Sequence, residues 1–115
     1  MEKTVEVLNR RPLKFTLGNY GSNANLMMFG RNTYRLSRIN IKKYLTWLEK
    51  IVETKPEKWI SIALDDMTSG ETHYISCSYH NNLFLFESDG FVALDETDCN
   101  KIINNIKDFL FGEKE

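Results

Sequence analysis

The feature that most constrains the fold is an apolar stripe with helical spacing in residues 40–54. Its members recur at intervals of three and four residues, so they lie on one face of an α-helix. They are Ile41, Tyr44, Leu45, Leu48, Ile51 and Val52. Asn40 is suited to cap the start of this helix, and Pro56 disfavours helix at Lys55. The stripe therefore predicts a helix that packs against a core.

A second stripe of the same kind lies at the end of the chain. When Asp98 is aligned with Asn40, the apolar positions of the two segments coincide, and Gly112 then supplies a residue that tolerates positive φ at the helix end. The apolar members are Cys99, Ile102, Ile103, Ile106, Phe109 and Leu110. Matching helices in two half-chains favour a duplicated architecture.

Short segments with alternating or continuous apolar residues precede each helix, and turn-forming residues separate them. The predicted strands are residues 4–8, 13–17, 26–29, 33–39, 59–64, 73–79, 83–87 and 91–94. The order predicts an α+β fold in a single domain, residues 1–115, built from ββββα units 1–56 and 57–115. Each unit is expected to form an antiparallel four-stranded sheet covered by a helix. This topology resembles the Whirly and PUR-type folds that bind single-stranded nucleic acids.

The chain lacks the marks of a membrane or secreted protein. No apolar run reaches the ~20 residues that cross a bilayer, and the N-terminus has no apolar secretory core. We therefore expect a cytoplasmic protein. Cys77 and Cys99 have no metal-binding pattern around them, so two buried free thiols are expected.

Patterns that carry catalytic chemistry are weak. His73 and His80 lack the further ligands that a zinc site needs, and neither Ser76 nor Ser78 follows a nucleophile-elbow pattern. The segment at residues 18–21 has no Lys-Ser/Thr after it and is not a phosphate loop. We expect no enzyme activity, no metal and no cofactor.

Charge divides sharply between the two halves of the chain. Residues 1–56 carry eleven Lys and Arg against four acids, whereas residues 57–115 carry four against twelve. Such asymmetry bears on partners rather than on fold. The acids gather in three clusters, which are Asp65, Asp66 and Glu71; Glu87 and Asp89; and Asp95, Glu96 and Asp98. Each acid alone is as compatible with a solvated surface as with a binding site.

The central part of the chain, roughly residues 34–96, resembles the immunity proteins of bacterial contact-dependent growth inhibition systems, in particular a subgroup with a Whirly-like fold. The segments that carry the resemblance are residues 41–44 leading to Trp47 and Leu48, residues 61–64, the loop 65–72, and residues 91–96.

The resemblance implies a protein that binds and neutralises a cognate toxin, in many cases a nuclease. A nuclease that binds phosphates needs a basic cleft, so the acidic clusters suit an inhibitor that covers that cleft. The partner is expected to be the C-terminal domain of the toxin. The expected partner-binding residues are Asp65, Asp66, Glu71, Glu87, Asp89, Asp95, Glu96 and Trp59, with Trp47 as the other candidate for an aromatic anchor.

The alternative interpretation is a protein that binds single-stranded DNA or RNA through its basic half. Arg31, Tyr34, Arg35, Arg38 and Lys42 interleave basic and aromatic groups, which is typical of such proteins. The acidic second half opposes this interpretation because it repels phosphates.

Overall fold

The structure is a computed structural model that describes residues 3–7, 13–20, 24–29, 32–67, 69–88 and 91–112, with side chains from Tyr34 onward. It has α+β architecture, as predicted, with four strands before each of two helices. The elements are β1 (Lys3–Val7), β2 (Leu13–Tyr20), β3 (Ala24–Phe29), β4 (Asn32–Leu36), α1 (Arg38–Thr54), β5 (Ile60–Asp65), β6 (Thr72–His80), β7 (Leu83–Glu87), β8 (Phe91–Leu94) and α2 (Glu96–Phe111).

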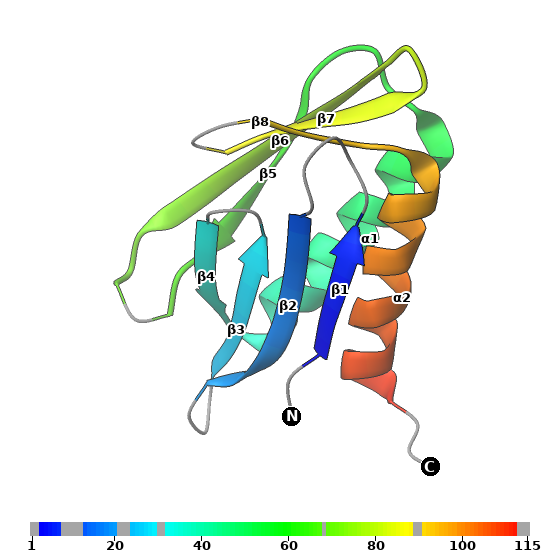
Figure 1. The fold of residues 1–115 in the computed structure, drawn as a ribbon. Coiled ribbons are helices and arrows are strands. Elements are labelled where there is room, and N and C mark those ends of the chain that lie inside the picture. Colours follow the sequence, from blue (N-terminus) through cyan, green and yellow to red (C-terminus); the bar gives the residue numbers. More distant parts are fainter. Residues whose placement is uncertain are drawn as a thin grey trace.

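The strands form two antiparallel sheets, β1-β2-β3-β4 and β5-β6-β7-β8, in which neighbours in the chain are neighbours in the sheet (Figure 1). The helices do not cover one sheet each. Instead, α1 contacts β3, β4 and β5, α2 contacts β1, β2 and β8, and the helices contact each other. The buried apolar residues form one cluster drawn from β4 to α2. Among the described side chains, which begin at Tyr34, the buried apolar residues therefore form one shared cluster and not one for each predicted ββββα unit.

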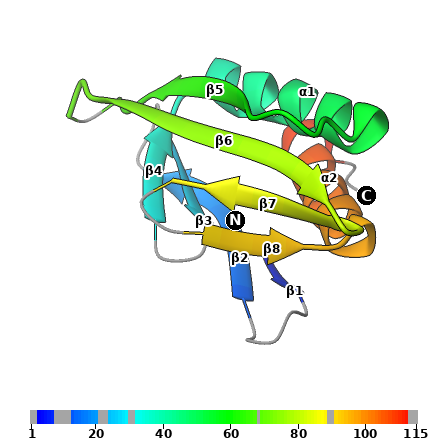
Figure 2. The same cartoon turned by 90° about the horizontal axis from the view of Figure 1, so that it is seen from above.

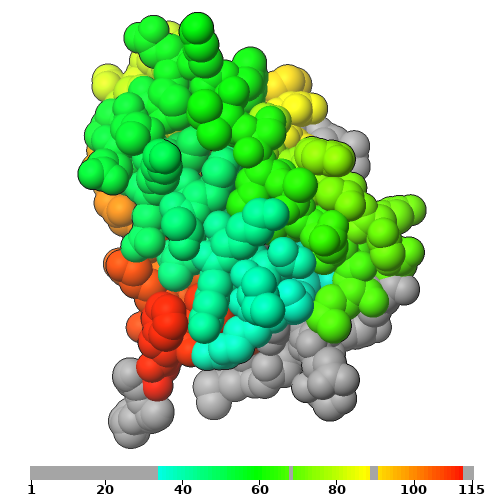
Figure 3. Space-filling model, turned by 180° about the vertical axis from the view of Figure 1, so that it is seen from behind, coloured from blue at the N-terminus to red at the C-terminus, as the bar shows by residue number. Residues whose placement is uncertain are grey.

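The apolar stripes account for this shared core. All six apolar residues predicted for the first helix are buried in α1, and five of the six predicted for the second are buried in α2, with Phe109 partly buried. Figure 3 shows α1, coloured cyan to green, at the back of the molecule with α2 beside it in orange to red. Neither helix in the described part of the chain is long and apolar enough to cross a membrane.

Both helices begin earlier than the sequence predicted. Ser37, not Asn40, caps α1, because its hydroxyl accepts a hydrogen bond of 3.1 Å from the Asn40 backbone N–H. Asp95, not Asp98, caps α2 in the same way, with a bond of 2.8 Å from the Asp98 N–H. A short polar side chain with extended backbone directly after a strand satisfies the free N–H groups of the first turn.

The two sides of the β5–β8 sheet differ. Ile62, Leu64, Ile75 and Phe84 point inward and are buried, which is the alternation that a sheet with one covered side requires. The register aligns the opposite set of residues on the outer face. Figure 2 views this sheet from above and draws no other labelled helix or strand across it.

Candidate protein-interaction face

Three aromatic residues belong to the outer face of the β5–β8 sheet. Tyr74 is 64% exposed, Phe91 is 73% exposed, and Trp59, directly before β5, is 49% exposed. The Trp59 and Phe91 ring centroids lie 6.5 Å apart, so the two rings approach each other although they come from opposite edges of the sheet. Exposed aromatic groups at this density are typical of binding surfaces.

Two of the predicted acids share this face. Asp65 is directly opposite Thr72, whose hydroxyl donates a bond of 2.9 Å to its carboxylate. Glu87 is directly opposite both Ser76 and Phe91. Both acids are exposed, and Glu71 is exposed just before the start of β6. The structure thus brings Trp59, Asp65 and Glu87 to one surface, with Glu71 at its end.

Asp66 has a different environment from its neighbour. Its carboxylate is buried and accepts hydrogen bonds from the backbone N–H groups of Arg35 (3.3 Å) and Ser69 (3.0 Å), and it lies 3.4 Å from Nε2 of His73. The Met67 N–H donates to the Arg35 carbonyl at 2.8 Å. Asp66 and Met67 therefore pair with the outer edge of β4 and attach the β5–β6 loop to the other sheet.

Asp95 and Glu96 lie at the opposite end of the strands, where β8 leads into α2 (Figures 1 and 2). The Asp95 carboxylate caps the helix, and Glu96 Oε1 is 3.3 Å from Nζ of Lys55. The predicted acids are therefore divided between two ends of the molecule. Asp89 lies outside the described residues.

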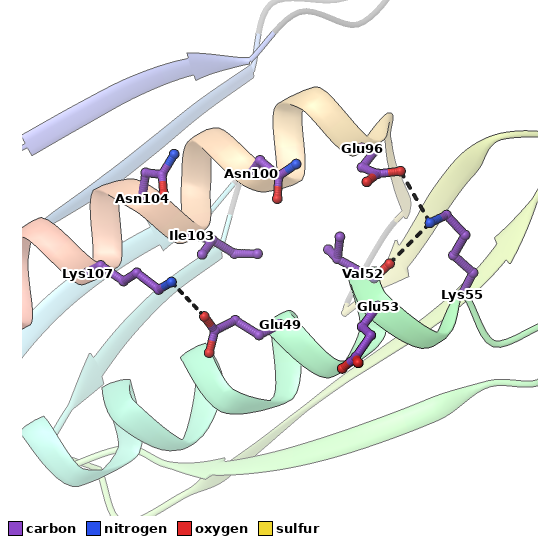
Figure 4. A pocket seen from close by; sticks show the side chains of 9 residues that line it. All are labelled: Glu49, Val52, Glu53, Lys55, Glu96, Asn100, Ile103, Asn104 and Lys107. Carbon is purple, nitrogen blue, oxygen red and sulfur yellow. Dashed lines mark hydrogen bonds and ion pairs between the residues drawn. The ribbon is translucent and has the colours of Figure 1, made fainter.

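A shallow groove of about 360 Å³ runs between α1 and α2 (Figure 4). Its two ends are closed by ion pairs, Lys55 with Glu96 and Lys107 with Glu49 at 2.9 Å, so these charges are already balanced within the chain. Exposed ion pairs of this kind contribute little stability. The side chains in the groove do not converge on one point.

The two cysteines lie in the buried interior. Burial raises the pKa of Cys77 to about 12 and also raises that of Cys99, so both thiols stay protonated near neutral pH. Both are free and buried, as predicted. Within the described residues, no group of three or more His, Cys, Asp or Glu side chains is placed to hold a metal ion.

The sequence interpretation missed Tyr74 and Phe91. Both lie in predicted strands, but the sequence analysis did not assign their side chains to a face. The strand register of the hairpins would have found them, because residues directly opposite each other on paired strands share a face. Trp47, the other candidate anchor, is partly buried and packs against Tyr44 and Phe86.

Comparisons with known proteins give no relative for this chain, because no family model, curated protein or solved structure matches it. The function must therefore be argued from the outer face of the β5–β8 sheet.

Proposed function

We propose that this chain is an immunity protein that binds and neutralises a cognate bacterial toxin, a nuclease with a basic active-site cleft. The observation that carries the proposal is the composition of the outer face of the β5–β8 sheet. It presents exposed aromatic groups beside the carboxylates of Asp65 and Glu87. A cleft built to bind phosphates is complementary to such a face in charge and, through the aromatic anchors, in apolar contact.

The absence of positive charge from the four strands supports this assignment. Strands β5 to β8 contain no Lys or Arg. The amine of Lys43 donates to the Ala63 carbonyl at 2.9 Å, and Lys58 lies just before the start of β5. A basic partner therefore meets no like charge within the strands, which favours fast and selective association. The order of elements, ββββα twice, is compatible with a Whirly-like immunity protein.

Co-expression in bacteria tests the proposal. The candidate toxin would be the C-terminal domain of a large secreted protein encoded directly upstream of the gene for this chain, and growth is measured with and without the chain. We expect the chain to restore growth and the purified pair to form a complex whose association slows as salt is added. Failure of both rescue and complex formation would overturn the proposal.

A matched pair of charge reversals locates the interface. Glu87→Lys alters the outer face, whereas Glu53→Lys makes the same change in the α1–α2 groove (Figure 4). We expect Glu87→Lys to slow association and weaken binding by about 10-fold or more, because it places a cation opposite a basic cleft. Glu53→Lys should leave the affinity within about twofold, since a charge outside the interface contributes little at physiological salt.

The second candidate function is binding of single-stranded nucleic acid, for which exposed rings on an open sheet are the favourable observation. The two carboxylates of the same face oppose it, because they would meet the phosphates. Fluorescence anisotropy with a labelled 30-nucleotide strand at low salt separates the two functions. Salt-sensitive binding of about micromolar affinity or tighter would favour the nucleic acid.

A further inference from the structure

The Trp59 and Phe91 ring centroids lie 6.5 Å apart although the two residues belong to opposite edges of the sheet, so the rings approach each other across the outer face. If the register is extended by one residue, Trp59 is opposite Ser78, in the same row as Leu85 and Ala93. Ser78 is fully buried although it belongs to the outer face, so neighbouring side chains cover it. The Trp59 and Phe91 rings therefore lie on a packed part of the outer face.

A polar row adjoins this aromatic pair. The register places Ser61, Ser76, Glu87 and Phe91 side by side across the four strands. The Ser61 and Ser76 hydroxyl oxygens are 2.7 Å apart and satisfy each other. Directly opposed residues have Cβ atoms about 5 Å apart, so the Glu87 and Phe91 side chains leave neighbouring strands side by side on this face.

The negative charge of Glu87 indicates what kind of group the surface around Trp59 and Phe91 would bind. Among the described residues, no hydrogen-bond or ion-pair partner is recorded for the Glu87 side chain, in contrast to Glu96 with its lysine. An exposed carboxylate next to two exposed rings offers a cation both an opposite charge and a π-face. Lys58 precedes Trp59 in the chain, but the strands themselves contain no basic residue.

We propose that this place is the docking point for an arginine side chain of the partner protein, with the guanidinium stacked on the Trp59 and Phe91 rings and donating hydrogen bonds to Glu87. Arginine fits better than lysine because its planar group stacks on rings and presents two N–H donors to one carboxylate. The inference rests on the function proposed above, since it specifies the side chain by which a basic partner would be recognised.

Titration with short peptides tests the arginine site without the toxin. The probes are tetra-arginine and tetra-lysine, each with blocked ends, added to ¹⁵N-labelled protein and followed by NMR. We expect tetra-arginine to shift the indole N–H of Trp59 and the amides of Glu87 and Phe91. Tetra-lysine should bind at least about threefold more weakly, because it lacks the planar stacking group.

Three variants separate the site from general charge attraction. Glu87→Gln and Phe91→Ala should each weaken tetra-arginine binding by about fivefold, since one removes the paired charge and the other removes a ring. Glu53→Gln is the matched control in the α1–α2 groove and should leave binding unchanged. The amide spectra of the free variants show whether they are folded.

Several outcomes would overturn the arginine site. One is equal binding of the two peptides, or equal weakening by Glu87→Gln and Glu53→Gln. Another is a change of the Trp59 resonance on dilution without peptide, which would make a second copy of the chain the occupant. A third is that a uridine oligonucleotide shifts the same resonances more than tetra-arginine does, which would indicate that the rings stack on bases.

The peptide test and the growth test fail independently. Peptide binding without growth rescue would retain the arginine site and reject the toxin partner. Growth rescue that survives both Glu87→Gln and Phe91→Ala, without peptide binding, would retain the immunity function and reject the arginine site.

Discussion

The two faces of the β5–β8 sheet are made by the same strands and differ in almost every physical respect. Inward residues such as Phe84 and Leu64 are fully buried among the helices. Outward residues one position away include exposed Tyr74 and Phe91 and the carboxylates of Asp65 and Glu87. Because side chains alternate along a strand, one set of backbone hydrogen bonds supports a buried face and an exposed face at once.

The comparison shows that a cluster of acids in the sequence is not a cluster of available charge. Asp65 faces solvent, whereas the next residue accepts hydrogen bonds from the backbone of another sheet. Asp95 caps a helix and Glu96 pairs with Lys55. A carboxylate can attract a partner fully only when its own chain has not already satisfied it.

The largest effect is expected from a matched pair of phenylalanines. Phe84→Ala removes a buried ring that packs against Tyr79, with centroids 4.6 Å apart, and should lower the free energy of unfolding by about 3–5 kcal/mol. Phe91→Ala removes an exposed ring and should cost less than about 1 kcal/mol. Urea unfolding followed by circular dichroism measures both.

The critical result is whether the two variants differ in the free energy of unfolding that they lose. If Phe91→Ala destabilised the protein as much as Phe84→Ala, the Phe91 ring would belong to the core. The outer face would then be a misassignment, and the interface proposed for it would have no aromatic anchor.

The next largest effect compares two adjacent acids. Asp66→Ala should lower the free energy of unfolding by about 2–4 kcal/mol, because it leaves the Arg35 and Ser69 N–H groups without their acceptor. Asp65→Ala removes one exposed bond with Thr72 and should cost less than about 1 kcal/mol. Urea unfolding again measures the difference. Equal costs would show that Asp66 does not attach the loop to β4.

Local patterns in the sequence were enough to place most of the fold. The helical stripe predicted every buried apolar residue of α1, and alternation predicted that Ile60, Ile62 and Leu64 share one side of β5, of which Ile62 and Leu64 are buried and Ile60 is exposed. These patterns work because burial against one surface imposes a period on the sequence. The β1–β4 assignment also had the right order, although β4 ends at Leu36 where Ser37 begins to cap the helix.

The helix starts were displaced because the two halves were aligned to each other. Asn40 was the predicted cap of the first helix and Asp98 was aligned with it, but both residues lie inside the helices, and their backbone N–H groups donate to the caps Ser37 and Asp95. The position of the capping residue depends on where the preceding strand ends, and the spacing of apolar residues in the helix gives no information about that point.

The candidate site was only partly predictable. Asp65, Glu87 and Trp59 were found by charge and residue type, but nothing local distinguished Asp65 from Asp66. The contact that separates them joins Arg35 to Asp66 across 31 positions of the chain. Such a contact depends on how the sheets pack, which neither composition nor periodicity contains.

The smallest effect concerns the inner face at alkaline pH. Burial raises the pKa of the Cys77 thiol from its ordinary 9.0 to about 12. The folded protein therefore holds this proton more tightly than the unfolded chain, so the stabilisation is complete below pH 9 and is lost as pH rises toward 12. Between pH 9 and 10.5 we expect the free energy of unfolding to fall more steeply than in Cys77→Ala, by at most about 1.4 kcal/mol per pH unit.

Cys99 remains in both proteins, but the Cys77 charge contributes to the raised pKa of Cys99, so the difference between the two pH profiles reports the Cys77 thiol together with its coupling to Cys99. Ser76→Ala is the outer-face control: it also removes one small polar group from β6, but that group does not titrate in this range. Its profile should run parallel to that of the unaltered protein. If the Cys77→Ala profile were parallel as well, the thiol would ionise as readily in the folded protein as in the unfolded chain, and burial of Cys77 would not account for its pKa.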